Sequence, residues 1–312
     1  MAAASSEPID IVLHPRHGPG LDKAVAEITG TAFSYPDSHE AAIDAMRDGA
    51  SVLVTFDWDD AFLTPDLHWV QAISAGVDQF PLEDLAESDV ILTSARGVHA
   101  PAVAEHALAL LFAAVRRIGP ALRRAERHEW RPEMGNEVRG LTVTILGMGS
   151  IGSEVARLLQ PFEVTVIGVR RHPELSDYAE AVVGPEELLW ACRRSDVLIC
   201  ALPETEETLS LVGKDELEAL GPGWVVNVGR GSSIDEDALV TALTEGALLG
   251  AAVDVTATEP LPDHSPLWDI ENLIITPHMA WATSQLTPRL VALITENIQA
   301  FKGERDWLNR IV

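Results

Sequence analysis

The sequence is poor in cysteine and has no long apolar run. Two cysteines, Cys192 and Cys200, stand among 312 residues, and so few thiols favour free side chains over a disulfide framework. A membrane helix needs about 18 consecutive apolar residues, and no such stretch occurs. Residues 1–8 also lack the basic start and the apolar middle of a signal peptide. These absences predict a soluble, cytoplasmic protein without a membrane span.

Positive charge is also scarce. The chain has 48 Asp and Glu against 22 Lys and Arg, a formal net charge of -26, and only three of its basic residues are lysines: Lys23, Lys214 and Lys302. A field of this sign repels nucleic acid and anionic lipid, which excludes both as partners. The acid excess favours a halophilic, salt-accumulating cytoplasm, where screening relieves self-repulsion. The alternative is an ordinary acidic protein from a GC-rich genome, which accounts for the arginine usage but not for the acid excess.

No metal site is expected. His14 and His17 flank Pro15 in a loop-like segment with no cysteine or carboxylate close by in the sequence. We therefore interpret the two histidines as a surface pair rather than as metal ligands.

The first hundred residues are typical of a small parallel α/β unit. Apolar runs at 9–13, 51–56 and 89–93 indicate buried parallel strands, with helical or loop-like segments between them. An almost wholly apolar helix is predicted over 101–115. Because it is apolar on all sides, this helix must be buried between layers or at a subunit interface.

A second α/β series begins at residue 141. Its strands are expected at 141–146, 164–169, 197–201, 224–228, 251–255 and 273–276. Strand–helix alternation at this spacing predicts a doubly wound parallel sheet. A last helix, 288–302, is long enough to return to the first unit. We therefore expect an α/β protein with two doubly wound parallel-sheet domains, Rossmann- or flavodoxin-like, and a cleft between them. The substrate domain would comprise residues 1–99 plus 286–312, and the dinucleotide-binding domain residues 100–285.

A dinucleotide site is predicted at residues 147–152, which read Gly-Met-Gly-Ser-Ile-Gly between a strand and a helix. Gly147 allows the tight turn, Gly149 lets the backbone approach a pyrophosphate, and Gly152 lets helix and strand pack closely. The pattern alone is weak, but the strand–turn–helix–strand context makes it specific.

The second strand of this unit ends without the expected acidic residue. A carboxylate at this point would bind the ribose 2′-hydroxyl of NAD, but the chain has Arg170 and Arg171 instead. Because arginine pairs well with phosphate, we predict that NADP(H) is preferred and that NAD(H) remains possible. The alternative is that both arginines are merely solvated.

Arg230, Glu259 and His278 each come shortly after one of the last three predicted strands. Open α/β sheets bind ligands outside the carboxyl ends of their strands. Arg230 can bind the carboxylate of a 2-oxo acid and polarise its carbonyl group. His278 can donate the proton and take it back in the oxidation, while Glu259 holds the imidazole and stabilises its charged form. Each residue alone has an ordinary alternative as an ion-pair partner, a cap or a core side chain.

Taken together, the chain resembles the D-isomer-specific 2-hydroxyacid dehydrogenases, which include glyoxylate/hydroxypyruvate reductases. The resemblance is most specific at residues 147–152, 227–231, 254–268 and 276–278. It implies a catalytic triad of Arg230, Glu259 and His278, a homodimer formed through the nucleotide domain, and no metal. It also implies that the backbone amides of Ala75 and Gly76 hold the substrate carboxylate.

The resemblance extends to the cofactor, where Asp254 would contact the nicotinamide carboxamide. The full set expected at the cofactor is Gly147, Gly149, Ser150, Ile151, Gly152, Arg170, Arg171, Leu202, Pro203, Val228, Asp254, His278 and Ala280.

Three functions are compatible with these residues. The first is a broad reductase of small 2-oxo acids that makes (R)-2-hydroxy acids reversibly. The second is a narrower glyoxylate/hydroxypyruvate reductase. For either reductase, Trp281 lines the substrate pocket or packs in the core. The third, from a different class, is a non-catalytic nucleotide sensor such as the transcriptional corepressors that share this fold, because fold alone does not fix function.

The acid excess leads to a test in salt. The protein is expected to remain folded and active in molar KCl and to lose activity on dialysis into low salt. At about 1 M ionic strength the screening length falls to about 3 Å, so the repulsion among the excess acids is relieved. Circular dichroism and turnover measured across a salt series would check this. Full stability and activity at low salt would contradict the halophilic interpretation.

Overall fold

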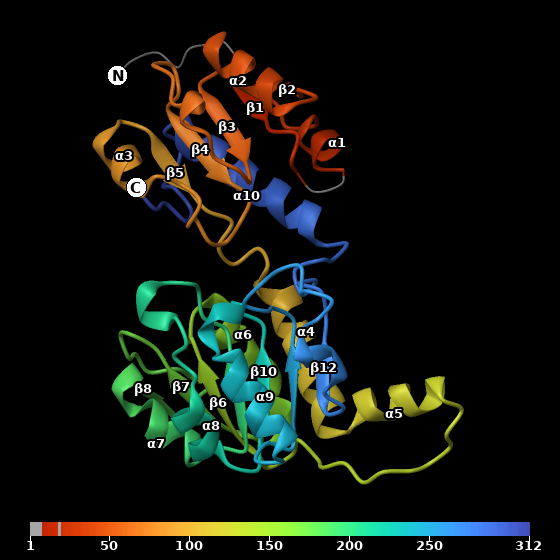
Figure 1. The fold of residues 1–312 in the computed structure, drawn as a ribbon. Helices are drawn as coiled ribbons and strands as arrows, with labels where there is room; N and C mark the ends of the chain where they lie inside the picture. Colours follow the sequence, from red (N-terminus) through yellow and green to blue (C-terminus); the bar gives the residue numbers. More distant parts are fainter. Residues whose placement is uncertain (1–7, 18–19) are drawn as a thin grey trace. The chain divides into compact units, whose positions relative to one another are not determined.

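The computed structural model describes residues 8–17 and 20–312, and the chain divides into two compact units (Figure 1). Unit 1 comprises Met1–His99 and Thr283–Val312, and unit 2 comprises Ala100–Ala282. Each unit contains one all-parallel sheet with helices packed on it, which confirms the predicted class of two parallel-sheet α/β domains. The prediction that the chain lacks a signal peptide rests mostly on residues 1–7, which lie outside the described residues.

The sheet of unit 1 has five parallel strands in the order β2-β1-β3-β4-β5. They are β1 Ile9–Leu13, β2 Thr31–Ser34, β3 Val52–Thr55, β4 Trp69–Ala72 and β5 Ile91–Thr93. The helices of this unit are α1 Leu21–Val25, α2 His39–Arg47, α3 Leu82–Glu87 and α10 Leu286–Phe301. The three predicted strands correspond to β1, β3 and β5. The other two were not predicted, because β2 is a half-exposed edge strand and Gln71 interrupts the apolar run of β4.

Alternate side chains of these strands enter two separate cores, as the two-residue period of a strand requires. Leu13 packs in one core with Ile294 of α10. Leu53 packs in the other with Met46 of α2. The C-terminal helix therefore forms one wall of unit 1, although the whole of unit 2 separates it from the other elements in the sequence.

A buried polar network fastens α10 to this sheet. Asn297 is fully buried, donates to Oε1 of Gln71 at 2.8 Å and accepts from the backbone N–H of Leu308 at 2.9 Å. Oε1 of Gln71 also accepts from the hydroxyl of Thr93 at 2.9 Å. A buried polar group left without a partner costs about 1–3 kcal/mol, so the network fixes both the position and the rotation of α10.

Unit 2 has seven parallel strands in the order β12-β11-β10-β9-β6-β7-β8. They are β6 Thr142–Leu146, β7 Thr165–Val169, β8 Ala181–Val183, β9 Val197–Cys200, β10 Trp224–Asn227, β11 Gly250–Val253 and β12 Leu273–Ile275. The helices are α4 Ala100–Val115, α5 Ile118–Glu126, α6 Ser150–Leu159, α7 Leu188–Cys192, α8 Lys214–Leu220 and α9 Glu236–Thr244. The strand order reverses between β6 and β9, which is the doubly wound arrangement with its ligand crevice at the switch point. Only the short edge strand β8 was not predicted.

The apolar helix predicted over 101–115 corresponds to α4. Its side chains share one core with β6, β10 and α6; Leu111 and Ile145 are two fully buried members. This packing satisfies the expectation of burial between layers. Throughout residues 8–17 and 20–312, no helix is both long enough and apolar enough to cross a membrane.

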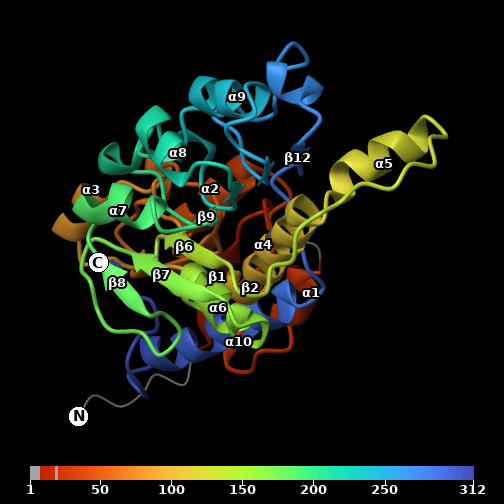
Figure 2. The ribbon, with the colours of Figure 1, turned by 90° about the horizontal axis from the view of Figure 1, so that it is seen from below.

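Helix α5 and the segment that follows it extend away from the body of unit 2 (Figure 2). Glu133 braces this arm by pairing with Arg117 at 2.8 Å and with Arg124. Four large apolar side chains of the arm are exposed: Ile118, Leu122, Trp130 and Met134. The arm is therefore a fixed structure whose apolar surface is not used inside unit 2.

Both cysteines are free thiols, as predicted. Cys192 and Cys200 are fully buried, and burial raises the pKa of Cys192 to about 12. Burial raises the pKa of Cys200 as well. Because the thiolate is the reactive species, both residues serve packing rather than chemistry.

Candidate functional site

The glycine turn between β6 and α6 leaves room for a ligand. Gly147 has φ +101°, and a Cβ there would stand 2.7 Å from the carbonyl oxygen of Ala201. A Cβ on Gly152 would stand 2.2 Å from the carbonyl oxygen of Gly147, so this close approach of helix and strand requires glycine. A Cβ on Gly149, by contrast, would have no heavy atom within 4 Å. The open space at the first turn of α6 fits a pyrophosphate bound by free backbone N–H groups.

Arg170 and Arg171 follow β7 directly, at the same edge of the sheet. Arg170 pairs with Glu174 at 3.1 Å, and Arg171 pairs with Glu207 at 3.3 Å. The glutamates are 70% exposed, so these are surface ion pairs of little net strength. Both guanidinium groups can therefore exchange their carboxylate for a phosphate at small cost.

Arg230 is held by the turn that follows β10. The side chain of Asn227 donates to the carbonyl oxygen of Arg230 at 3.0 Å and accepts from the N–H of Gly229 at 3.0 Å. A Cβ on Gly231 would stand 1.9 Å from the carbonyl carbon of Thr256, so the loops after β10 and β11 approach closely. No carboxylate among the described residues forms an ion pair with Arg230, whose Nη1 donates only to the carbonyl of Gly229. The guanidinium is therefore left with donors for an anion.

Glu259 and His278 come together, as the sequence predicted they would. Nδ1 of His278 lies 2.6 Å from Oε2 of Glu259, and Oε1 of Glu259 accepts from the N–H of Thr256 at 3.1 Å. The carboxylate accepts a hydrogen bond from Nδ1–H, which leaves Nε2 as the nitrogen that can exchange a proton with a substrate. Both side chains are partly exposed, at 43% for His278 and 37% for Glu259, so a ligand can reach them.

The remaining predicted cofactor residues line the same sheet edge. Leu202 and Pro203 follow β9, Val228 follows β10, and Ala280 is buried beyond β12. The loops after β9 and β10 approach so closely that a Cβ on Gly229 would stand 2.6 Å from the backbone nitrogen of Leu202. Trp281 is 43% exposed and is therefore not a core side chain.

Two residues that contact Asp254 were not among the predicted site residues. Thr276 and His106 both contact the buried carboxylate of Asp254, and His106 comes from α4. No local pattern indicates this contact, because α4 and β12 are far apart along the chain.

Ala75 and Gly76 belong to unit 1, in the loop that follows β4. The hydroxyl of Ser74 donates to the carbonyl of Gly76 at 2.7 Å, and Nε2 of Gln79 donates to the carbonyl of Phe56 at 2.7 Å. The loop is thus shaped by its own side chains. Its part in substrate binding stays a prediction, because the other candidates belong to unit 2.

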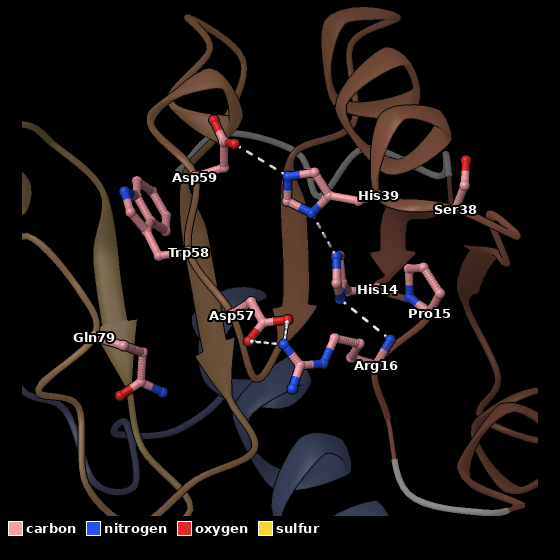
Figure 3. A pocket seen from close by; sticks show the side chains of 9 residues that line it. All are labelled: His14, Pro15, Arg16, Ser38, His39, Asp57, Trp58, Asp59 and Gln79. Atoms are coloured by element: carbon pink, nitrogen blue, oxygen red, sulfur yellow. Dashed lines mark hydrogen bonds and ion pairs between the residues drawn. The ribbon is translucent and has the colours of Figure 1, made fainter.

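Unit 1 also contains a cavity of about 610 Å³ beyond the carboxyl ends of β1 and β3 (Figure 3). His14 is 1% exposed there, so the expectation of two surface histidines is wrong for this residue. Nδ1 of His14 accepts from the N–H of Arg16, Nε2 lies 3.1 Å from Nδ1 of His39, and Nε2 of His39 lies 3.1 Å from Asp59. Burial lowers the pKa of His14, and nearby Asp57 opposes the shift.

The arginine of this cavity already has a carboxylate partner. Arg16 pairs with Asp57 at 2.9 Å, and His39 contacts Asp59. Because this cation is paired and two aspartates line the cavity, it is a poorer candidate for binding a carboxylate than the sheet edge of unit 2. Among the described residues, no group of three or more His, Cys, Asp or Glu side chains is arranged to hold a metal ion.

Comparison with known proteins agrees with this geometry. Residues 108–280 match the family described as D-isomer specific 2-hydroxyacid dehydrogenase, NAD binding domain. The chain is 33% identical over 281 residues to a glyoxylate reductase of Korarchaeum cryptofilum, covering 86% of this chain and 84% of that protein. It is 36% identical over 250 residues to glyoxylate/hydroxypyruvate reductase B of Pectobacterium carotovorum, covering 77% and 78%.

A solved structure is similar over nearly the whole chain. It is an NADPH-dependent glyoxylate/hydroxypyruvate reductase of Sinorhizobium meliloti in complex with NADP and malonate. The TM-score is 0.81 and the identity 29%, and the match covers 98% of this chain and 97% of that one.

Proposed function

The chain belongs to the D-isomer-specific 2-hydroxyacid dehydrogenases and reduces 2-oxo acids with NAD(P)H, and from this premise we propose how its own residues divide the work. Arg230, Glu259 and His278 carry the chemistry of the substrate. The observation that supports this most strongly is the 2.6 Å contact between His278 and Glu259 at the sheet edge where Arg230 follows β10. The guanidinium of Arg230 has no carboxylate partner among the described residues.

Arg230 binds the substrate carboxylate and polarises the C2 carbonyl group. The reduced nicotinamide, when bound, supplies the hydride that C2 receives. His278 donates its Nε2 proton to the carbonyl oxygen, and the carbonyl becomes a hydroxyl group. Glu259 holds Nδ1, so the ring keeps one orientation while the Nε2 proton is transferred. The reverse sequence oxidises a 2-hydroxy acid.

Replacement of the proton donor tests this division of roles. His278→Gln and Glu259→Gln are expected to lower kcat, the former by about 10²–10⁴-fold as is usual for loss of a general acid, while NADPH binding is retained. NADPH oxidation in molar KCl, with a panel from glyoxylate to branched-chain 2-oxo acids, measures this. The matched control is His264→Gln, at an exposed histidine elsewhere in unit 2.

A His278→Gln variant with the kcat of the unmodified protein would refute the assignment. If the unmodified protein binds NADPH but turns over no 2-oxo acid, the nucleotide-sensor alternative gains instead.

We further propose a broad range of small 2-oxo acids, reduced to the (R)-2-hydroxy acids, with Ala75 and Gly76 holding the substrate carboxylate from unit 1. The exposed indole of Trp281 supports a role at the substrate rather than in the core. The narrower alternative is a reductase for glyoxylate and hydroxypyruvate, which the names of the relatives favour. The ranking within the same substrate panel decides between them.

NADPH is the proposed reductant, with Arg170 and Arg171 as ligands of the 2′-phosphate. The support is the missing acidic residue after β7, the weak surface pairing of both arginines, and a similar structure that holds NADP. A dianionic phosphate offers each guanidinium shorter and stronger hydrogen bonds than an exposed glutamate does.

Charge reversal at these two positions is therefore expected to act on one cofactor only. The double variant Arg170→Glu/Arg171→Glu should lower kcat/KM for NADPH by at least about tenfold, since one charge-assisted hydrogen bond contributes at least about 1.4 kcal/mol. Efficiency with NADH should change little. Arg139→Glu, at an exposed and paired arginine of the same unit, serves as the control. An unchanged ratio of NADPH to NADH efficiency would exclude the phosphate-binding role.

We also propose that the protein is a homodimer formed through the α5 arm of unit 2. Trp130 and Met134 are 101% and 92% exposed, and Leu122 is 61% exposed, on an arm that ion pairs hold in place. An apolar surface on a rigid projection is costly in water, whereas a second copy can cover it.

Introducing charge on the arm should then separate the copies. The unmodified protein is expected to sediment as a dimer in molar KCl and Leu122→Glu/Trp130→Glu as a monomer, since burial of a carboxylate at an apolar interface is unfavourable. Leu175→Glu is the matched control, because Leu175 is equally exposed on a different loop. A monomer at micromolar concentration without any substitution would contradict the proposal.

The charge balance supports a further proposal, that the protein works in a salt-accumulating cytoplasm. Its acids outnumber its basic residues by more than two to one. The surface pairs that do form, such as Arg139 with Glu163, leave most of the acids uncompensated. Counter-ions at high concentration screen this excess.

A further inference from the structure

The turn that carries His278 is held by one buried carboxylate. Asp254 is 2% exposed. Its Oδ1 accepts from the N–H of Met279 at 3.0 Å, and its Oδ2 accepts from the N–H of Ala280 at 2.9 Å. The N–H of His278 itself donates to the backbone carbonyl of Asp254 at 2.7 Å. The backbone N–H groups of three consecutive residues, 278–280, therefore all donate to Asp254.

His278 needs this support because of its backbone conformation. Its φ is +49°, in the left-handed region that a residue with a side chain rarely occupies. Such a conformation persists only when the surroundings over-determine it. The bonds to Asp254 do so, and they set the direction of the imidazole toward Glu259.

Two more side chains reach the carboxylate of Asp254. The hydroxyl of Thr276 donates to Oδ1 at 2.5 Å. Nε2 of His106 lies 3.1 Å from the Thr276 hydroxyl oxygen and 3.3 Å from Oδ1 of Asp254. Because the Thr276 proton points at the carboxylate, the N–H of His106 is the donor in its contact with Thr276.

Asp254 depends on these donors for compensation. Within the described residues no lysine or arginine forms an ion pair with it. A buried carboxylate is tolerated only when it is well hydrogen-bonded. The contact also explains why α4, an almost wholly apolar helix, carries a histidine whose side chain is only 19% exposed.

We propose that His106 and Thr276 are positioning residues for His278. They fix the carboxylate of Asp254, and Asp254 fixes the turn at residues 278–280. The effect on turnover rests on the proposed function, whereas the effect on the turn does not.

Isosteric pairs of variants test the proposal. Thr276→Val and His106→Leu remove a donor, and each is expected to lower kcat about tenfold, as loss of one hydrogen bond to a charged group does. Thr276→Ser and His106→Gln keep a donor and should retain most of the activity. The double variant Thr276→Val/His106→Leu should have a kcat no lower than that of the less active single variant, because both side chains act through the carboxylate of Asp254.

Amide hydrogen exchange supplies a readout that needs no catalysis. The N–H groups of Met279 and Ala280 should exchange about tenfold faster in Thr276→Val and His106→Leu, and at the original rate in Thr276→Ser and His106→Gln. Faster exchange together with an inactive unmodified protein would support the positioning role and refute the proposed function. Unchanged exchange in Thr276→Val and His106→Leu, or failure of the serine and glutamine variants to restore it, would overturn the positioning role.

Discussion

All seven strands of the larger sheet run in the same direction, and the candidate site depends on this constraint. Parallel strands release every following loop at one edge of the sheet. The glycine turn after β6, the arginines after β7 and the three polar candidates after β10, β11 and β12 therefore meet there. Glycine allows neighbouring backbone segments to approach closely at this edge, since a Cβ at Gly152 or Gly231 would collide with adjacent backbone atoms.

The charge of the chain and the charge of its ligands have the same sign. A protein with a net charge of -26 has to bind a nucleotide and a carboxylate. Long-range attraction is absent, so the binding proposed above depends on short contacts with Arg170, Arg171 and Arg230. Salt suits this arrangement, because it screens distant acids over a few ångströms while it affects bidentate contacts much less. The acidic surface and a few well-placed arginines are therefore compatible.

Much of this organisation could be predicted because its signals are local. Fully buried parallel strands are continuous apolar runs, so nine of the strands were identified, with only small shifts at their ends. The reaction class followed from the order of Arg230, Glu259 and His278 after successive strands, and the family comparison confirms that class. The short strands β2 and β8 lack this signal, because their side chains are only partly buried and need not form an apolar run.

Contacts between distant segments, by contrast, leave no local trace. The burial of His14 depends on its packing beside His39 and Phe62, and its own segment reads as an exposed loop. Nor does a histidine in an apolar helix indicate that its ring reaches the carboxylate of Asp254. The sequence by itself determined which strands and helices form, the glycine turn and the chemical types at the sheet edge, since these depend on neighbouring residues. Only the tertiary structure decided which distant side chains satisfy each buried polar group, because that depends on which elements pack together.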